Sequence, residues 1–328
     1  MKVSGFKLTL AATALAFAIG AGFSGTAKAG SIPESDDAII VTISDWTGQI
    51  FQSYVYGALL EKMGYNVEYV VAGYFPQIAA LAEGNLTTQS ELWSSNMGEG
   101  WDPYFESGQV VDMGGSGAEA MEAWYYNAKA LELCPGLADG WEALYECGEI
   151  FADAETHPNG RLVDKPIEWG TDNVKRIAAL NLPLVSSPSG SEGAEVAEII
   201  SAFERDEPLL VNFWEPHWVM ADYDLIELPL PAYEEGCHDD PSIGINPDMI
   251  FDCGWAEERL YKAAWSGMEE KWPAAFRLFA LVSFSGADQA GAMKNVDVDG
   301  GDLHEYVDAW LADNESRWQA WIDGATLE

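Results

Sequence analysis

Hydrophobic and polar positions follow two alternating periods along the first third of the chain. The run AIIVTI (38–43) is almost continuously apolar, which is typical of a buried strand. In the next segment, 48–64, apolar residues recur at helical spacing until a glycine ends the pattern. The alternation continues with strands predicted over 66–72 and 86–93, and helices predicted over 75–85 and 100–107. This pattern predicts an α/β fold with a mainly parallel sheet flanked by helices.

The rest of the chain shows the same patterns with one interruption. Strands are predicted over 122–128, 160–164 and 208–214, and helices over 137–146, 191–207, 273–284 and 301–325. The segment 231–256 is rich in Pro, Gly, Asp and Cys and is predicted to be an irregular loop. The length of the chain exceeds what one core comfortably serves, so two domains are expected.

The first residues have the organisation of an export signal. Lys2 and Lys7 precede an apolar stretch (8–23), which ends before Ala27-Lys28-Ala29, a small-residue cleavage pattern. The stretch is too short and too rich in Ala and Gly for a good membrane-spanning helix. We therefore predict a signal peptide over 1–29, export to the periplasm, and no direct membrane insertion of the remaining chain.

The charge balance is strongly acidic. The sequence has 54 acidic residues against 16 Lys and Arg, a formal net charge of −38, and the predicted signal peptide removes three of the lysines. Such a charge repels nucleic acid and anionic lipid, so neither is expected as a partner. Two interpretations of the acidity remain open: a solvated surface suited to salty surroundings, or a field that attracts a cation.

The four cysteines suggest disulfides rather than chemistry. An even number in an exported chain is typical of a disulfide framework. Of the three possible pairings, Cys134–Cys147 with Cys237–Cys253 is favoured because it closes two short loops of similar size. There is no C-x-x-C pair and no histidine cluster, so neither a zinc site nor a catalytic thiol is predicted.

Four tryptophans fall where a ligand would lie. Trp46, Trp93 and Trp214 end predicted strands, and Trp169 lies in the loop after the strand 160–164. Ligands of open α/β sheets bind beyond the carboxyl ends of the strands. Several indole faces can enclose a quaternary ammonium group through cation–π attraction, although tryptophans also serve simply as core residues.

The stretch DWTGQIF (45–51) supplies a second candidate element. It joins a strand to a helix start, whose free N–H groups can bind an anion. Thr47, Gly48 and Gln49 are therefore expected near an oxygen of the ligand. Asp45 or Thr47 is expected as the helix N-cap.

Polar residues beside the tryptophans complete the candidate site. His217 can donate to an anionic group of the ligand, and Glu168 can add negative charge. The sequence lacks G-x-S-x-G, H-E-x-x-H and P-loop motifs, so no enzyme activity is predicted. An extracytoplasmic enzyme acting on methylated ammonium compounds remains a distant alternative, with His217 or Glu215 as its general base.

No cofactor is required by the sequence, but two acidic clusters raise the question of calcium. Four aspartates of the irregular loop are candidate ligands: Asp239, Asp240, Asp248 and Asp252. A second cluster, Asp297, Asp299 and Asp302, lacks the full EF-hand pattern, and Asp302 is expected to cap the next helix.

Several stretches together resemble one known family. They are IFQSYVYGALLEKMGYNVEYV, LAEGNLTTQSELW, GRLVDKPIEWGTDN, EPLLVNFWEPHWVMADYDL and GGDLHEYVDAWLADNESRWQAWI. Over 38–325 the chain resembles the periplasmic binding proteins of glycine betaine-type ABC importers. Around Trp169 it departs from the family pattern, with Glu168 before the tryptophan and Thr171 where the family often has cysteine.

The resemblance implies a fold and a function. The expected fold is a two-lobe, type II-like binding protein, with one lobe from 30–118 plus 230–328 and the other from 119–229. The lobes would close over a methylated ammonium osmolyte held in an aromatic box by Trp46, Trp93, Trp169 and Trp214. A monomer that delivers its ligand to an ABC permease of the inner membrane is implied. The chain is most similar in character to the trimethylamine N-oxide-binding branch. Glycine betaine, choline or a sulfonium osmolyte are alternative ligands, and a chemosensory role with the same fold stays open.

Overall fold

The computed structural model describes residues 31–96 and 100–327, so the predicted signal peptide lies outside the described residues. The strands of the described part are β1 (Ile39–Ile43), β2 (Val67–Val71), β3 (Thr88–Trp93), β4 (Val110–Tyr126), β5 (Gly160–Asp164), β6 (Leu184–Pro188), β7 (Leu210–Glu215), β8 (Ile226–Glu227) and β9 (Glu258–Trp265). The helices are α1 (Thr47–Lys62), α2 (Gln77–Ala82), α3 (Asp102–Glu106), α4 (Ala128–Leu133), α5 (Leu144–Cys147), α6 (Asp172–Ala179), α7 (Glu192–Arg205), α8 (Val219–Asp222), α9 (Met268–Lys271), α10 (Pro273–Leu281), α11 (Gly286–Met293), α12 (Leu303–Asp313) and α13 (Glu315–Thr326).

One mixed sheet organises these elements, in the strand order β2-β1-β3-β9-β4-β7-β5-β6, with β8 pairing to β4. The pairs at both ends of this order are parallel: β1 with β2 and β3, and β5 with β6 and β7. The central pairs made by β9 and β4 are antiparallel. The predicted α/β fold with helix-flanked parallel strands is confirmed.

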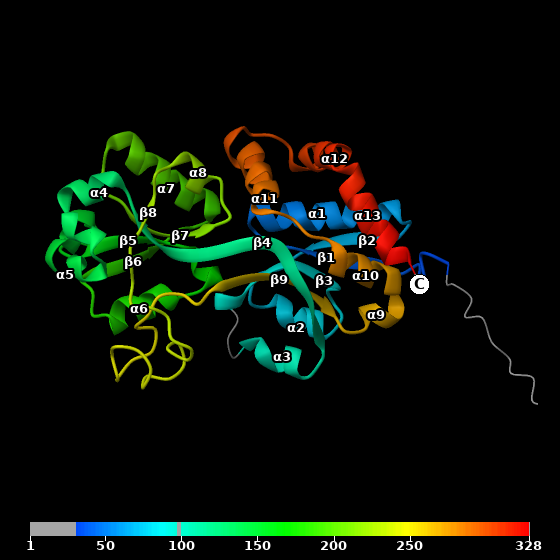
Figure 1. Cartoon of the computed structure of the whole chain (residues 1–328), viewed down its shortest axis with the longest axis horizontal. Helices are drawn as coiled ribbons and strands as arrows, with labels where there is room; N and C mark the ends of the chain where they lie inside the picture. Colours follow the sequence, from blue (N-terminus) through cyan, green and yellow to red (C-terminus); the bar gives the residue numbers. More distant parts are fainter. Residues whose placement is uncertain (1–30, 97–99, 328) are drawn as a thin grey trace, which may run out of the picture. The chain divides into compact units, whose positions relative to one another are not determined.

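The parallel strands form two groups, the first made of β1, β2 and β3 and the second of β5, β6 and β7. Strand β4 connects the two groups. Its residues 110–120 pair with β9, and its residues 121–126 pair with β7. The register shifts twice in the first part, on either side of Gly115, where the strand is rich in glycine. Such irregularities bend a strand and re-aim its side chains, and Figure 1 shows β4 running from the β9 side to the β7 side.

Apolar side chains of the first parallel group cover both of its faces. On one face Ile39 and Val41 of β1 pack with Phe51 and Val55 of α1. On the other face Leu92 of β3 belongs to a core that α2 completes. Figure 1 shows α1 and α2 on opposite sides of these strands. Burial on both faces explains why β1 reads as a continuous apolar run in the sequence.

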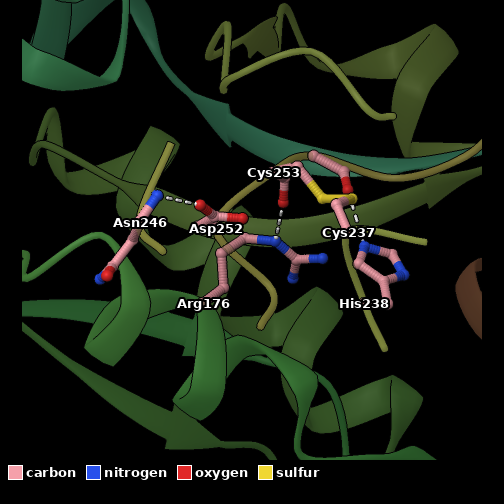
Figure 2. Close-up of a disulfide and its surroundings, with 7 residues drawn as sticks. Arg176, Cys237, His238, Asn246, Asp252 and Cys253 are labelled. Atoms are coloured by element: carbon pink, nitrogen blue, oxygen red, sulfur yellow. Dashed lines mark hydrogen bonds between the residues drawn. A yellow bond between two sulfur atoms is a disulfide. The ribbon is translucent and has the colours of Figure 1, made fainter. Parts of the chain in front are cut away.

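Both disulfides of the structure follow the favoured pairing. Cys134 is bonded to Cys147, and Cys237 to Cys253. The second bond closes much of the segment 231–256, which contains neither helix nor strand, as predicted. The buried Arg176 of α6 donates from Nε to the Cys253 carbonyl at 2.8 Å, which ties this loop to the body of the protein (Figure 2). Over the described ranges, every helix is too short or too polar to cross a bilayer.

Candidate ligand-binding site

The four predicted tryptophans surround one cavity. Among the described residues its lining is Trp46, Tyr74, Trp93, Glu122, Lys165, Trp169 and Trp214. The cavity has a volume of about 410 Å³, part of it open to solvent. These dimensions fit a small ligand with an apolar surface.

Each ring reaches the cavity from the end of a regular element. Trp46 follows β1 in an extended conformation and precedes α1, whereas Trp93 is the last residue of β3. Trp214 lies near the end of β7, and Trp169 ends a short 3₁₀ turn (Ile167–Trp169) after β5. All four side chains are less than a tenth exposed. The cavity therefore lies beyond the carboxyl ends of these strands, the place where open α/β sheets bind ligands.

Trp169 connects the rings of the two parallel groups. Its ring centroid lies 5.6 Å from that of Trp46 and 5.4 Å from that of Trp214, both in edge-to-face geometry. Edge-to-face contacts turn neighbouring faces in different directions, as an enclosure around a small group requires. Trp214 in turn stacks on Phe213, with 4.4 Å between the centroids. The aromatic walls thus support one another through their mutual contacts.

Carboxylates accept the N–H groups of three of these indoles. The buried Glu91 accepts through one oxygen from Nε1 of Trp46 at 2.8 Å and from Nε1 of Trp93 at 2.9 Å. Nε1 of Trp169 donates to both oxygens of Asp45, at 3.1 and 3.2 Å. Burial raises the pKa of Glu91 to about 7, against the lowering effect of its hydrogen bonds. These hydrogen bonds hold the rings in place and leave their faces toward the cavity.

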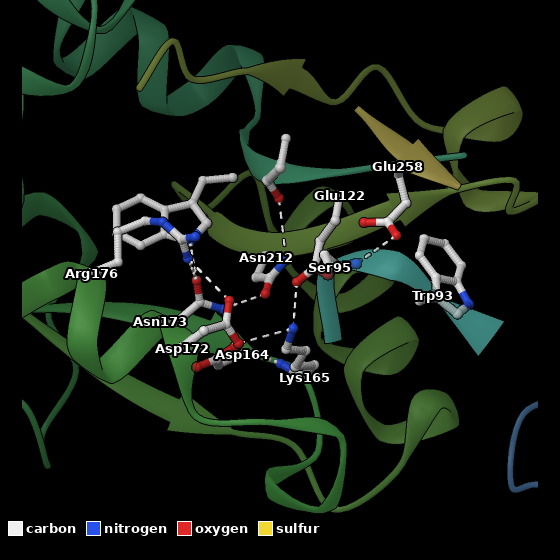
Figure 3. Close-up of polar contacts among 12 residues, drawn as sticks. Trp93, Ser95, Glu122, Asp164, Lys165, Asp172, Asn173, Arg176, Asn212 and Glu258 are labelled. Carbon is white, nitrogen blue, oxygen red and sulfur yellow. Dashed lines mark hydrogen bonds and ion pairs between the residues drawn. The ribbon is translucent and has the colours of Figure 1, made fainter. Parts of the chain in front are cut away.

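A buried ion pair forms the polar part of the lining (Figure 3). Nζ of Lys165 lies 2.6 Å from Glu122 and 3.1 Å from Asp172, and Lys165 and Glu122 are almost completely buried. Burial alone would lower the pKa of Lys165, but the two carboxylates raise it. Burial raises the pKa of Glu122 to about 7, whereas Lys165 and Arg176 hold the pKa of Asp172 below its usual range.

Comparison with known proteins decides the family. Residues 37–313 match the family described as the substrate-binding domain of ABC-type glycine betaine transport systems. The chain belongs to this family. Its members are transport substrate-binding domains rather than enzymes, so the prediction of no enzyme activity is confirmed.

Individual members resemble the chain over most of its length. It is 29% identical over 293 residues to the trimethylamine N-oxide-binding protein of Pelagibacter ubique, covering 87% of this chain and 90% of that protein. It is 24% identical to the glycine betaine/proline betaine-binding periplasmic protein of Escherichia coli, covering 85% and 87%. Among solved structures, a choline-binding protein with choline superposes with a TM-score of 0.70 at 20% identity, covering 89% and 93%. Lactococcal OpuAC with glycine betaine superposes at 0.65 and 15% identity, covering 88% and 100%. The two structures support the binding-protein fold.

In this glycine betaine-type binding domain, the start of α1 is arranged differently from the prediction. The N-cap is Trp46, without a side-chain capping bond, so Asp45 or Thr47 as N-cap was wrong. The backbone N–H of Thr47 donates to the Glu192 carboxylate at 3.3 Å, and the Thr47 hydroxyl donates to Asp297 at 2.8 Å. A carboxylate of the protein itself therefore occupies the anion position at this helix start.

The other predicted polar residues lie outside the lining of the cavity. His217 is buried, and its Nε2 lies 3.2 Å from Glu192. Gly48 of α1 faces Met293 and Gln289 of α11. The buried Gln49 accepts from the Ser44 N–H and donates to Thr42. Glu168, which was also predicted to contact the ligand, has an exposed side chain. Their contacts to a ligand stay predictions.

The loop aspartates do not gather into a ligand set. Asp239, Asp240, Asp248 and Asp252 form no group of three or more ligand atoms within 4.8 Å over the described residues. The one such group among the described residues is Cys237, His238 and Cys253, and the sulfurs of its two cysteines are bonded to each other in the disulfide. Asp252 instead accepts a hydrogen bond from the backbone of Asn246 (Figure 2). The calcium prediction gains no support, whereas Asp302 caps α12 as expected.

Sequence reasoning missed three lining residues and the carboxylate behind two of the rings. Tyr74 precedes α2, Glu122 lies within β4, and Lys165 follows β5 directly. The strand-end rule that selected the tryptophans would also have selected Lys165. Glu91 lies two residues before Trp93 on β3, so both side chains share one face of the strand. That spacing was a usable signal.

Proposed function

We propose that this binding domain is the periplasmic receptor of an ABC importer and captures a small methylated ammonium compound, with trimethylamine N-oxide as the favoured ligand. The supporting observation is that Trp46, Trp93, Trp169 and Trp214 line one cavity. Each indole face attracts a cation by about 0.5–2 kcal/mol. A fully substituted nitrogen carries no N–H, so it leaves no donor unsatisfied among aromatic walls.

The polar lining supports an N-oxide over a carboxylate. The one cationic side chain among the described lining residues is Lys165, and its ammonium already contacts Glu122 and Asp172. The carboxylate of glycine betaine would need several strong donors and would lie near Glu122. The single oxygen of trimethylamine N-oxide needs fewer donors, and the whole molecule is smaller. Choline, whose hydroxyl can donate to Glu122, is the second candidate.

Ligand capture would use two lobes, 30–118 plus 230–328 and 119–229. The strand β4 and the segment between β8 and β9 would carry the chain between them. The contacts that would then join the lobes include those of Trp169 with Asp45 and of Glu192 with Thr47. Both contacts lie beside the cavity or at the start of α1. In this proposal they hold the lobes closed over the ligand.

The cellular role follows from the proposed receptor function. Export by a cleaved signal peptide over 1–29 would deliver the chain to the periplasm, where it would hand its ligand to an inner-membrane permease. The match to a trimethylamine N-oxide-binding protein and to a periplasmic betaine-binding protein supports this role.

Isothermal titration calorimetry of the purified protein with trimethylamine N-oxide, glycine betaine and choline tests the proposal. We expect saturable one-to-one binding, tightest for trimethylamine N-oxide. Tight binding of glycine betaine alone would overturn the ligand preference but keep the receptor function. Binding of none of the three would overturn the function.

A further inference from the structure

We propose that the Glu91 carboxylate is the counter-charge for the ligand's cationic nitrogen, and that capture of the cation is linked to release of a proton from this side chain. The inference rests on the proposed function and assigns a role to a residue that does not itself line the cavity. Glu91 would act through Trp46 and Trp93, as a residue that sets the charge and position of two aromatic walls.

The hydrogen bonds of Glu91 couple it directly to the rings. One carboxylate oxygen accepts the N–H groups of both Trp46 and Trp93, at 2.8 and 2.9 Å. The other oxygen accepts from the side-chain amide of Gln52 on α1. An anionic acceptor at the N–H makes the hydrogen bond stronger and the indole more electron-rich, which strengthens the attraction of its face for a cation.

Glu91 is a buried acid without a cationic partner in the described part of the chain. Its side chain is 1% exposed, and none of the ion pairs there includes it. A buried carboxylate lacking an opposite charge is costly, and such a group gains a proton unless a cation is supplied. A methylated ammonium held by Trp46 and Trp93 is a cation placed on the far side of the same two rings.

The surroundings can serve Glu91 in either protonation state. The Oε1 atom of Gln52 is buried and has no hydrogen-bond partner among the described residues. When Glu91 is ionised, the amide NH₂ of Gln52 donates to it. When Glu91 is protonated, rotation of the amide by half a turn would let Oε1 accept the carboxyl proton. The orphaned oxygen is therefore explained by a carboxyl that changes its protonation.

Other titratable groups near Glu91 could also make ligand affinity depend on pH, so the experiment must separate their contribution from that of Glu91. Glu192 from α7 acts on it electrostatically and helps to raise its pKa, after burial, to about 7. Tyr74, from the segment before α2, faces it as well. Glu122 and Lys165 line the cavity from the β4 and β5 side, and the pKa of Glu122 is also raised to about 7.

Asp297 and His217 are two further titratable groups close to Thr47 and Glu192. Burial and Glu192 raise the pKa of Asp297 to about 6, and His217 acts on it in the opposite direction. Both residues are linked to Glu192 or Thr47 rather than to the two indoles. A pH dependence of ligand affinity belongs to Glu91 only if it disappears when Glu91 alone is changed.

The test compares the unaltered full chain with Glu91→Gln. Glutamine can keep the geometry, because its oxygen can accept both indole N–H groups while its amide donates to Oε1 of Gln52 once the Gln52 amide has rotated by half a turn. The probes are trimethylamine N-oxide and tert-butanol, which has the same shape but a neutral carbon in place of the nitrogen. A matched control is Glu258→Gln, since Glu258 is a buried carboxylate that bonds to Ser94 and does not line the cavity.

Calorimetry in buffers of different ionisation enthalpy measures both affinity and protons released. For the unaltered protein we expect affinity for trimethylamine N-oxide to rise as pH increases from about 6 to about 8, with proton release near pH 7. Glu91→Gln should bind this ligand about tenfold more weakly at pH 8, a change equivalent to one pKa unit of coupling, and should release no proton. Its binding of tert-butanol should change less than twofold, and Glu258→Gln should behave like the unaltered protein.

Two results would overturn the inference while leaving the receptor function intact. One is an equal loss of affinity for both probes in Glu91→Gln, which would make Glu91 a purely structural support. The other is proton release that persists in Glu91→Gln, which would assign it to Glu122 or Asp297. If the unaltered protein binds no methylated ammonium compound, the proposed function itself fails.

Discussion

Replacement of Trp169 by leucine separates ligand binding from folding. The ring of Trp169 contacts those of Trp46 and Trp214, and the side chain is 8% exposed. Leucine keeps an apolar side chain but removes the aromatic face. Loss of one cation–π contact is worth about 0.5–2 kcal/mol, so binding of trimethylamine N-oxide should weaken by roughly 2- to 30-fold. Water entering the opened wall would add to this loss.

The magnitude can be checked with one intermediate and one control variant. Trp169→Phe keeps an aromatic face but cannot donate to Asp45, so its affinity should lie between those of the unaltered protein and Trp169→Leu. Trp318→Leu removes a tryptophan of similar burial, 9% exposed, whose N–H is bonded to Leu311 in the core beneath α13. It should lower the free energy of unfolding but leave ligand affinity unchanged.

The assay is calorimetric titration at constant pH, with thermal unfolding measured on the same samples. The reasoning is refuted if Trp169→Leu folds and binds trimethylamine N-oxide as tightly as the unaltered protein. It is equally refuted if Trp318→Leu weakens ligand binding as much as Trp169→Leu does, because the effect would then come from general loss of stability.

Further predictions concern buried charge and the disulfide loop. Lys165→Met should lower the free energy of unfolding by about 3–5 kcal/mol in chemical denaturation, because it leaves Glu122 buried without its cation, and adding Glu122→Gln should restore part of the loss. Burial raises the pKa of Glu195 well above 4.5, and within the described ranges neither of its carboxyl oxygens has a hydrogen-bond partner. The folded protein therefore binds a proton that the unfolded chain has lost, so its stability falls as pH rises above about 4.5. The stability advantage of Glu195→Gln should accordingly grow between about pH 5 and about pH 8 in thermal unfolding, and a constant difference would contradict this reasoning. Replacing Cys237 and Cys253 by serine should cost about 2–4 kcal/mol and speed proteolysis within 231–256, whereas unchanged proteolysis would show that the loop is held by other contacts.

The elements that position the tryptophans could be predicted from the sequence for a simple reason. Strands β1 and β7 are buried and read as mainly apolar runs, and Trp46 and Trp214 stand at or near their ends. Strand β3 is buried although it reads TQSELW, and Trp93 is its last residue. Three strands of the described sheet, β6, β8 and β9, were not predicted. β9 contains no β-branched residue, and β6 contains two serines and a proline. Their place in the sheet is decided by pairing with distant strands rather than by local preference.

The polar part of the site depended on long-range pairing. Glu122 lies directly opposite Trp214 because β4 runs antiparallel to β7. Only the last part of β4 was predicted, since its first part contains glycines and register shifts that obscure a strand pattern. The same limit applies to the start of α1, where Glu192, far along the chain, takes the anion position that the local sequence seemed to leave for a ligand.

The central claim is that the indole rings converge on the methylated nitrogen of a bound ligand. A crystal structure of the protein with trimethylamine N-oxide measures this directly. We predict that the nitrogen lies within about 6 Å of the ring centroids of at least three of Trp46, Trp93, Trp169 and Trp214, with the oxygen toward Lys165 and Glu122. A ligand bound elsewhere, or lying in the cavity with its oxygen against the indole faces and its nitrogen away from them, would contradict the account.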